Sequence, residues 1–234
     1  MNYNYKRILL KISGNFFSGQ SSQGIDFDAI DQVAQEVMSL HQQSAQIAIV
    51  NGAGNIFRGR SRAKNFDQTA ADQIGYIATL PNSMALAEIL NSKGADTRLM
   101  CSFEIPGIAR HFDAFKARKL LSQNKILIFG GGTGHPFFST DTAAVLRALE
   151  IKADILLKAT DVDGVYSADP QIDANAVKYD KLTYKEALDK KLQVMDQTAF
   201  ALGRDNGLKI LVFKFEPGAL VKILKNPEKG TLIS

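Results

Sequence analysis

"IFGGGTGHPFFSTD", from Ile128 to Asp141, is the stretch that decides the fold. It contains four glycines, and its only formal charge is the final aspartate. The apolar run "KILIF" at 125–129 overlaps its start and the amphipathic "STDTAAVLRALEI" at 139–151 overlaps its end, which predicts a strand, a glycine turn and a helix. Glycine lets backbone N–H groups approach a ligand closely, and a helix N-terminus adds partial positive charge. This pattern is typical of a site for an anion such as phosphate.

Two other apolar runs end in the same way. "RILLKI" at 7–12 leads into Ser13-Gly14, and "QIAIV" at 46–50 leads into "NGAGN" at 51–55. The carboxyl ends of parallel strands meet at one edge of a sheet, where ligands bind in open α/β folds. A single glycine run could be no more than a tight turn. Three of them at one edge predict sites for two phosphorylated ligands, or for one long ligand.

Strands and helices alternate along the rest of the chain. Helices are predicted at 26–43, 183–190, 196–206 and 217–224, with a long helix over 67–93 that Pro81 should start, kink or break, and further strands at 97–101, 154–159, 209–213 and 230–234. This alternation predicts an α/β fold with a mainly parallel sheet covered on both faces. No linker divides the chain, so we expect a single domain over 1–234. The segment 161–181 is predicted to be the longest irregular stretch, and loops of this length are often functional.

Composition narrows the class of protein. The chain has 234 residues, of which 45% are hydrophobic and 22% charged, as in ordinary globular domains. The net charge of +4 comes from dispersed basic residues, which disfavours a nucleic-acid partner. The single cysteine, Cys101, excludes an intramolecular disulfide framework, and the three histidines are too scattered to predict a metal site held by the protein. The N-terminal apolar run is too short for a signal peptide and no stretch approaches the ~20 apolar residues of a membrane span, so we expect a cytoplasmic protein without membrane contact.

Three charged residues are candidates for phosphoryl chemistry, which needs positive charge over the transferred group. Lys11 in "ILLKIS" and Lys158 in "ILLKAT" have apolar neighbours and lie at the ends of predicted strands, so they could straddle a phosphoryl group. Asp141 could orient both ammonium groups, or could serve only as a carboxylate that favours the N-terminus of its helix. The common P-loop and dinucleotide fingerprints are absent from the sequence, so any phosphate chemistry must be of another type.

Two more charged residues are weaker candidates. Arg58 follows the second glycine turn and opens the basic cluster "RGRSRAK" at 58–64, which could close over a triphosphate or be a solvated loop. Asp72 lies in a predicted helix, where it could accept hydrogen bonds from ribose hydroxyls, although most helix aspartates are simply solvated.

Six sequence blocks, in chain order, resemble those of the bacterial uridylate kinases (UMP kinases) of the amino-acid kinase superfamily. They are "KRILLKISGN", "VNGAGNIFRG", "ADQIG", "GGGTGHPFFSTDTAA", "LLKATDVDGVYSADP" and "LQVMDQTAF". The resemblance covers nearly the whole chain. It implies a three-layer α/β/α sandwich with a mainly parallel central sheet, which is the amino-acid kinase fold. It also implies a homohexamer that transfers the γ-phosphoryl group of ATP to UMP in pyrimidine biosynthesis, with Mg²⁺ carried by ATP.

The resemblance also assigns site residues, with Lys11, Asp141 and Lys158 as the catalytic group. On the ATP side it implies Lys11, Ser13, Gly14, Gly54, Arg58, Thr160, Tyr166 and Asp169. On the UMP side it implies Gly52, Ala53, Asp72, Thr133, Gly134, His135, Pro136, Phe137, Phe138, Ser139 and Thr140. UTP is expected to act as a feedback inhibitor at the UMP site, because a uracil nucleotide fits the same pocket.

The chain departs from the family pattern at several positions. Asn15 stands where the family usually has Glu, Ala53 interrupts a run of three glycines, and His135 stands where Asn is usual. The run "LPNSMAL" at 80–86 replaces a segment associated with contacts between subunits and with effectors, which leaves activation by GTP open.

Three alternatives remain at this point. Other amino-acid kinases act on acetylglutamate, glutamate, aspartate or carbamate, although "GTGHPFFSTD" suits a nucleotide better than an amino acid. A protein of the same fold could bind nucleotides or oxyanions without catalysis, but the presence of Lys11, Asp141 and Lys158 together favours an enzyme. A regulator that binds nucleic acid is the third alternative, and it rests only on the basic isoelectric point.

Overall fold

A central sheet organises the protein, as seen in a computed structural model that describes residues 5–21, 23–59, 65–170, 172–173 and 175–234. The described residues form a nine-stranded sheet in the order β4-β3-β5-β2-β1-β6-β10-β11-β9, which is parallel except where β10 pairs with β11. Its strands are β1 (Arg7–Ile12), β2 (Gln46–Asn51), β3 (Thr97–Cys101), β4 (Arg110–His111), β5 (Ile126–Gly130), β6 (Ile155–Thr160), β9 (Lys181–Leu182), β10 (Ile210–Lys214) and β11 (Thr231–Ile233).

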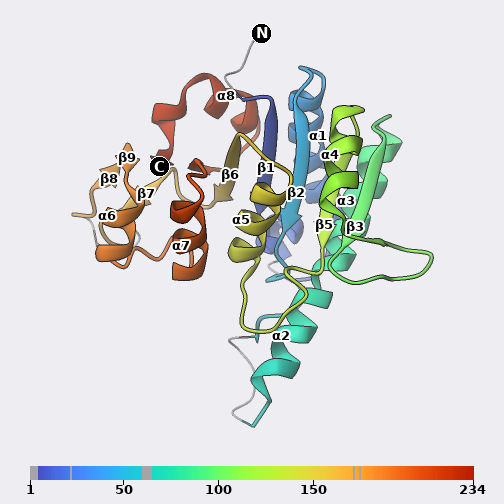
Figure 1. The fold of residues 1–234 in the computed structure, drawn as a ribbon. Helices are drawn as coiled ribbons and strands as arrows, with labels where there is room; N and C mark the ends of the chain where they lie inside the picture. Colours follow the sequence, from blue (N-terminus) through green and yellow to red (C-terminus); the bar gives the residue numbers. More distant parts are fainter. Residues whose placement is uncertain (1–4, 22, 60–64, 171, 174) are drawn as a thin grey trace.

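Helices cover both faces of this sheet (Figure 1). One face packs against α1 (Phe27–His41), α3 (Thr79–Ser92) and α8 (Ala219–Lys225). The other packs against α4 (Ala114–Ser122), α5 (Thr140–Glu150), α6 (Tyr184–Asp189) and α7 (Gln197–Asp205). Helix α2 (Gln68–Ile77) extends away from the body of the molecule (Figure 1). This arrangement confirms the predicted three-layer α/β/α sandwich.

The alternation of side chains along the strands places two lysines on one face. In β1, Ile8, Leu10 and Ile12 pack towards α1, whereas Leu9 packs towards α5, so Lys11 lies on the α5 face as well. In β6 the same alternation sends Leu156, and hence Lys158, to the α5 face. Lys11 and Lys158 are register partners in the parallel β1–β6 pair. Sheet geometry alone therefore brings the two ammonium groups side by side.

The structure differs from the sequence-based expectations in three segments. The long helix expected over 67–93 is two helices that meet at Ala78, and Pro81 lies in the first turn of α3, where the missing N–H costs no helical hydrogen bond. The segment 161–181, expected to be irregular, contains a hairpin of β7 (Val165–Tyr166) and β8 (Lys178–Tyr179). Strand β4 and helix α4 were not predicted, although Asp113 caps α4. Short 3₁₀ turns complete the described elements at Gly14–Phe17, Gly19–Ser21 and Pro227–Lys229.

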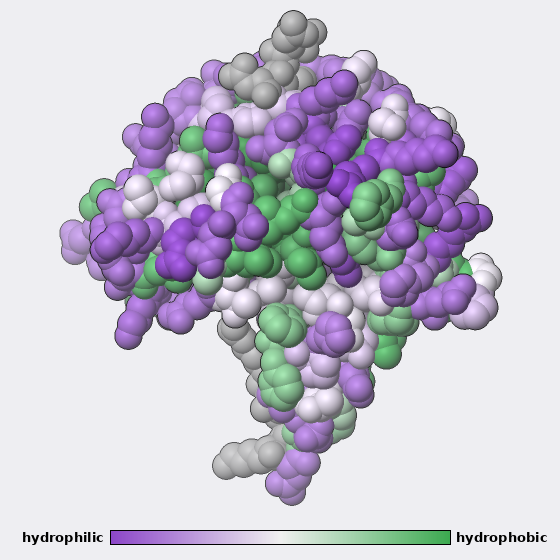
Figure 2. Space-filling view, viewed as in Figure 1, coloured by the Kyte–Doolittle hydropathy of each residue, from purple (hydrophilic) through white to green (hydrophobic). Residues whose placement is uncertain are grey.

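Most of one face of the molecule is hydrophilic, with apolar residues gathered near its centre (Figure 2). Among the described residues, no helix is both long enough and apolar enough to cross a membrane.

A buried carboxylate joins α1 to α8. Glu36 of α1 is only 8% exposed, and its carboxylate accepts hydrogen bonds from the N–H groups of Gly218 and of Leu220, the latter at 3.1 Å. Gly218 precedes α8 with a φ of 80°, a conformation that favours glycine. A buried carboxylate is tolerated only when its hydrogen bonds are satisfied, and here it supplies the cap that α8 lacks within its own sequence.

We expect the substitution Glu36→Gln to lower the free energy of unfolding by about 1.5–3 kcal/mol, because a charge-assisted cap is lost and the new amide NH₂ faces N–H donors. Glu228→Gln, at an exposed position, is the matched control and should change stability by less than about 0.5 kcal/mol. Urea unfolding measures both variants. Equal midpoints for the two would contradict the capping role.

Candidate active site

Two lysines and one aspartate form the charged centre of the site. Asp141 Oδ1 lies 2.7 Å from Lys11 Nζ and 2.7 Å from Lys158 Nζ. The lysines are 7% and 5% exposed, and the Asp141 side chain is 17% exposed. Two adjacent ammonium groups repel each other, and the shared carboxylate offsets that repulsion. The lysine–aspartate cluster (Lys11, Asp141 and Lys158) still carries one positive charge in excess, which suits an anionic ligand.

Burial and charge act in opposite directions on this cluster. Burial lowers the pKa of Lys158, the Asp141 charge opposes that effect and the Lys11 charge adds to it, so that the pKa falls to about 8. Burial alone would raise the pKa of Asp141, but the two ammonium groups lower it by more, and the carboxylate stays ionised at neutral pH. Such perturbed groups are common at functional sites.

Asp141 is held in place by the N-terminus of α5. The Ser139 side chain caps this helix, accepting from the N–H groups of Asp141 at 3.0 Å and Thr142 at 3.2 Å. The Ser139 hydroxyl in turn donates to the Asp196 carboxylate, which also accepts from Thr142 Oγ1 at 2.8 Å. Asp196 caps α7 as well, through the Ala199 N–H. One carboxylate therefore fixes the ends of two helices.

Asp196 was not singled out from the sequence, although it lies in the block "LQVMDQTAF" and has the pattern of a helix cap. The structure also commits the Ser139 hydroxyl, predicted to contact UMP, to capping contacts and to Asp196.

The first and second glycine turns touch one another. The Gly52 N–H donates to the Ile12 carbonyl at 2.8 Å. A Cβ on Gly14 would lie 2.5 Å from the Gly54 nitrogen, so no larger residue fits there without displacing the second turn. A Cβ on Gly52 would lie 3.7 Å from Thr140 Oγ1, at the start of α5. The two turns and the N-terminus of α5 therefore converge beside the lysine–aspartate cluster.

Arg58 bridges these two turns. Its Nε donates to the Gly54 carbonyl at 2.8 Å and its Nη2 to Asn15 Oδ1 at 3.1 Å. Asn15, one of the departures from the family pattern, is thus a partner of this guanidinium. The remainder of the basic cluster, 60–64, lies outside the described residues.

A cleft of about 760 Å³ opens from the lysine–aspartate cluster towards the β7–β8 hairpin, a volume suited to a nucleotide-sized ligand. The candidate ATP residues that line it are Lys11, Ser13, Lys158, Thr160, Tyr166 and Asp169. The Tyr166 hydroxyl donates to Asp163 Oδ1 at 2.6 Å, and Thr160 Oγ1 donates to the Val162 carbonyl at 2.6 Å. Gly14, Gly54 and Arg58 are not part of this lining and lie on the neighbouring turns.

The third glycine turn is close-packed on one side and open on the other. Gly131, Gly132 and Gly134 all have positive φ, and a Cβ on Gly131 would lie 2.6 Å from Cys101 Sγ. Ser102 supports the turn from behind, since its hydroxyl donates to the Gly132 carbonyl at 2.6 Å. Glycine is required here by both conformation and space. The open side carries the exposed side chains of His135, Phe137 and Phe138, of which Phe137 is 73% exposed, and the half-buried Thr133 and Pro136.

Asp72 joins α2 to this turn. Its Oδ2 accepts from the Phe137 N–H at 2.8 Å, and its Oδ1 accepts from Gln68 Nε2 at 2.7 Å. Phe137 has a φ of 69°, which is uncommon for a residue with a side chain. The structure thus brings Asp72 to the predicted acceptor loop, and each of its carboxylate oxygens already has one protein partner.

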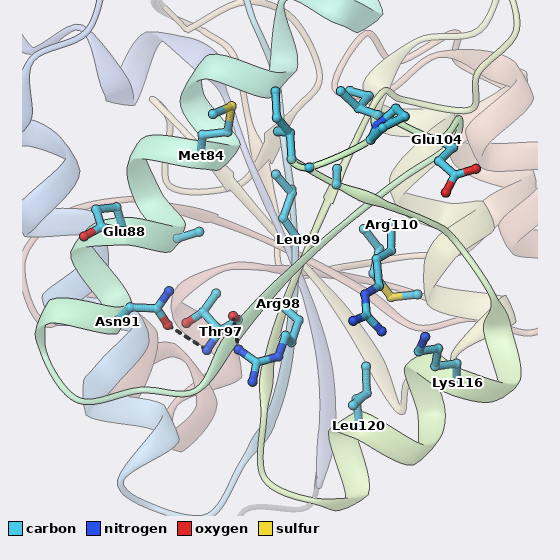
Figure 3. Close-up of a pocket in the computed structure, with 17 residues that line it drawn as sticks. Met84, Glu88, Asn91, Thr97, Arg98, Leu99, Glu104, Arg110, Lys116 and Leu120 are labelled. Atoms are coloured by element: carbon cyan, nitrogen blue, oxygen red, sulfur yellow. Dashed lines mark hydrogen bonds between the residues drawn. The ribbon is translucent and has the colours of Figure 1, made fainter.

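A second hollow, of about 640 Å³, lies at the β3–β4 edge of the sheet (Figure 3). Met84, Glu88 and Asn91 of α3 line this hollow together with Arg98 of β3 and Arg110 of β4 (Figure 3). Asn91 Oδ1 accepts from the Thr97 N–H at 2.9 Å. No sequence pattern predicted this hollow, and its lining shares no residue with the 760 Å³ cleft.

The fold and the charged centre agree with comparisons with known proteins. The model of the amino acid kinase family matches residues 6–214. The chain belongs to the amino acid kinase family. Among relatives in this family, the uridylate kinase of Marinobacter nauticus is 46% identical over 231 residues, covering 98% of this chain and 96% of that protein. The uridylate kinase of Salmonella typhimurium is 44% identical over 232 residues, with the same coverage.

Solved structures of the amino acid kinase family agree with this placement. The UMP kinase from Bacillus anthracis matches with a TM-score of 0.94 and 38% identity, covering 98% of this chain and 96% of that one. The UMP kinase from Ureaplasma parvum matches with a TM-score of 0.93 and 35% identity over the full length of both chains. The predicted resemblance to the uridylate kinases is therefore confirmed.

The lowered pKa of Lys158 predicts a specific pH dependence for this kinase. We expect kcat/KM to fall as pH rises through about 8, because deprotonation of Lys158 removes positive charge from the cluster. In Lys158→Arg, whose guanidinium stays charged, the residual activity should persist to higher pH. Ionisation of the substrates is common to both enzymes and cancels in the comparison. A wild-type profile that stays flat to pH 10, or identical profiles for both, would contradict this assignment.

Proposed function

We propose that this chain is a UMP kinase, which transfers the γ-phosphoryl group of ATP to the phosphate of UMP and yields ADP and UDP. The observation that carries the proposal is the contact of two buried ammonium groups with one carboxylate, at the edge where the glycine turns converge. The uridylate kinases among its relatives support the choice of acceptor.

The transfer is an in-line displacement. An oxygen of the UMP phosphate forms a bond to the γ-phosphorus, while the bond from that phosphorus to the β–γ bridging oxygen breaks. The attacking phosphate is already an anion, so no general base is needed. Lys11 and Lys158 neutralise charge on the transferring group, and Asp141 holds both ammonium groups at the correct separation. Catalysis then consists of placement and electrostatic stabilisation.

ATP occupies the 760 Å³ cleft in this proposal. Thr160, Tyr166 and Asp169 line the part of the cleft that receives the adenosine, while Lys11 and Ser13 lie at the phosphate end. The backbone N–H groups of Gly14 and Gly54 face the phosphates, and Arg58 adds positive charge between the first two turns.

Mg²⁺ enters as part of the MgATP substrate. Mg²⁺ usually binds one or two carboxylates together with substrate phosphates. The Asp141 carboxylate is occupied by two lysines, which leaves it little capacity to bind a metal ion as well. The donor set therefore fits a metal held mainly by the phosphates of ATP.

UMP binds across the third turn and the N-terminus of α5. The helix N-terminus and the turn present N–H groups to its phosphate. Asp72 accepts hydrogen bonds from the ribose through the lone pairs that Gln68 and Phe137 leave free. The remaining acceptor residues are Gly52, Ala53, Thr133, Gly134, His135, Pro136, Phe138, Ser139 and Thr140. UTP, as a uracil nucleotide, is a feedback inhibitor that competes for this site.

The kinase assembles as a homohexamer and acts in the cytoplasm, in pyrimidine nucleotide biosynthesis. Large exposed apolar side chains support association: Ile77 is 49% exposed, Ile108 is 51% exposed and Phe115 is 79% exposed.

We expect UMP to stimulate ATP turnover far more than CMP, dUMP, AMP, GMP or N-acetylglutamate. The acceptor loop suits a nucleotide, and a site that hydrogen-bonds a polar acceptor strongly rejects analogues that leave its groups unpaired. A coupled assay for ADP release measures the panel. Equal or greater stimulation by N-acetylglutamate would place the chain with a different amino acid kinase activity.

Asp72→Asn should raise the KM for UMP about tenfold or more, because hydrogen bonds to a charged acceptor are worth about 1.5–3 kcal/mol and the amide offers one neutral acceptor oxygen. The KM for ATP should hardly move, since the ATP cleft is lined by other residues.

Comparison with dUMP separates the two contacts of Asp72. A carboxylate that holds the 2′-hydroxyl gives the wild type a preference for UMP over dUMP, and the variant loses part of it. If Asp72 acts only by fixing the loop at Phe137, the KM for UMP and the KM for dUMP rise by the same factor, and the preference for UMP over dUMP is unchanged. That outcome would exclude a hydrogen bond between Asp72 and the 2′-hydroxyl of the ribose.

A further inference from the structure

A buried polar network lies behind the glycine turns, where α3 begins. Thr79, Asn82 and Ser83 of α3 are at most 1% exposed, and their spacing places them on one face of the helix. Asn51 and Asn55, at the two ends of the second glycine turn, are equally enclosed, with 0% and 3% exposure. Buried polar groups are costly unless they are hydrogen-bonded, so the partners of these five side chains reveal what the network holds.

Asn82 and Asn55 hold the second turn through a reciprocal amide pair. Asn82 Nδ2 donates to Asn55 Oδ1 at 2.8 Å, and Asn55 Nδ2 donates to Asn82 Oδ1 at 3.0 Å. The second N–H of the Asn82 amide donates to the Gly52 carbonyl at 2.9 Å, and the second N–H of the Asn55 amide donates to the Gly24 carbonyl at 2.7 Å. Every N–H of the two amides is satisfied, and the second turn is fixed to α3.

Thr79, one helical turn before Asn82, holds the third turn. Its Oγ1 accepts from the Gly131 N–H at 2.9 Å and donates to the Tyr76 carbonyl at 2.7 Å. The Thr79 carbonyl accepts from Asn51 Nδ2 at 2.9 Å, and Ser83 Oγ donates to Asn51 Oδ1 at 2.6 Å. The same helical turn is thus hydrogen-bonded to both the second and the third glycine turn.

We propose that the first turn of α3 sets the distance between bound ATP and bound UMP, with Thr79 and Asn82 as positioning residues for phosphoryl transfer. The inference rests on the proposed function, in which Gly54 of the second turn serves the donor and the third turn serves the acceptor. Neither side chain touches substrate, since both act through the backbone of the turns. A shift of about 1 Å between reacting groups can cost on the order of 10²-fold in rate. A single rigid helical turn that holds both glycine turns therefore affects the rate of phosphoryl transfer directly.

The composition of this helical turn supports positioning over simple packing. The first turn of α3 has no side-chain N-cap, because Ala78 has helical backbone angles and continues directly from α2. The polar side chains of the turn instead point at the two glycine turns. Apolar residues would fill the same space without the cost of desolvating five polar groups, whereas a fully satisfied network fixes one geometry.

Thr79→Val is the main test, because valine keeps the shape and removes only the hydroxyl. Thr79→Ser restores the hydroxyl and serves as the rescue. Thr97→Val is the matched control: Thr97 is 4% exposed, and its hydroxyl has no hydrogen-bond partner among the described residues.

Two measurements separate positioning from loss of structure. The first compares kcat with the Kd of ATP alone and of UMP alone. The second compares the Kd values of two bisubstrate compounds, in which adenosine and uridine are joined through their 5′ oxygens by either four or five phosphates. The ratio of these two Kd values reports the distance between the two sites. A general loss of stability that weakens the binding of both compounds by the same factor leaves this ratio unchanged.

We expect Thr79→Val to lower kcat by about 10- to 100-fold while the Kd of ATP changes less than about twofold. The tetraphosphate-to-pentaphosphate Kd ratio should shift at least about threefold, because the preorganised separation is lost. Thr79→Ser should restore both kcat and the Kd ratio towards their wild-type values, and Thr97→Val should match the wild type in both. Should Thr79→Val fail to fold, Ser83→Ala removes one bond of the same network and should shift the ratio in the same direction.

An unchanged kcat, or a fall in kcat with an unchanged ratio, would overturn the positioning role. The proposed function fails separately, if wild-type enzyme shows no ATP turnover that depends on UMP.

Discussion

The shared carboxylate of Asp141 is the interaction on which the site depends. Two ammonium groups buried beside one another would repel, and each would be costly to desolvate alone. Sheet register forces them together, because Lys11 and Lys158 are paired residues of β1 and β6 with side chains on the same face. Asp141 makes this arrangement tolerable, and the cap at Ser139 together with Asp196 keeps Asp141 in place. Fold, cluster and helix caps are therefore one connected system.

Much of the fold and of the charged centre could be predicted from the sequence. The apolar runs around Lys11 and Lys158 marked buried strands, and the glycine-rich stretch before Asp141 marked a strand, turn and helix. These signals are local, because side-chain alternation and helix caps extend over only a few residues. They were sufficient to predict a mainly parallel sheet covered on both faces and to select the three members of the cluster as candidates, and the family resemblance added the three-layer sandwich.

The features that were missed depend on contacts between distant segments. Asp196 lies far along the chain from Ser139, and nothing near it in sequence reveals their contact. Asn82 and Thr79 read as ordinary polar residues in a helix, and only the fold shows that they are buried against two loops. The break at Ala78 was foreseen only in part, since Pro81 signalled a boundary without fixing its position. Side-chain networks of this kind require the tertiary structure.

The lowered pKa of Lys158 has a thermodynamic consequence for ligand binding. Near pH 8 the unliganded protein holds this proton only part of the time. In the proposed complex with ATP, the polyphosphate lies beside this amine and favours its charged form, so binding draws a fraction of a proton from solution, and by linkage the affinity increases as the solution becomes more acidic. The same buried geometry that concentrates positive charge thus makes nucleotide binding a proton-coupled equilibrium, in which the buffer contributes to the observed heat.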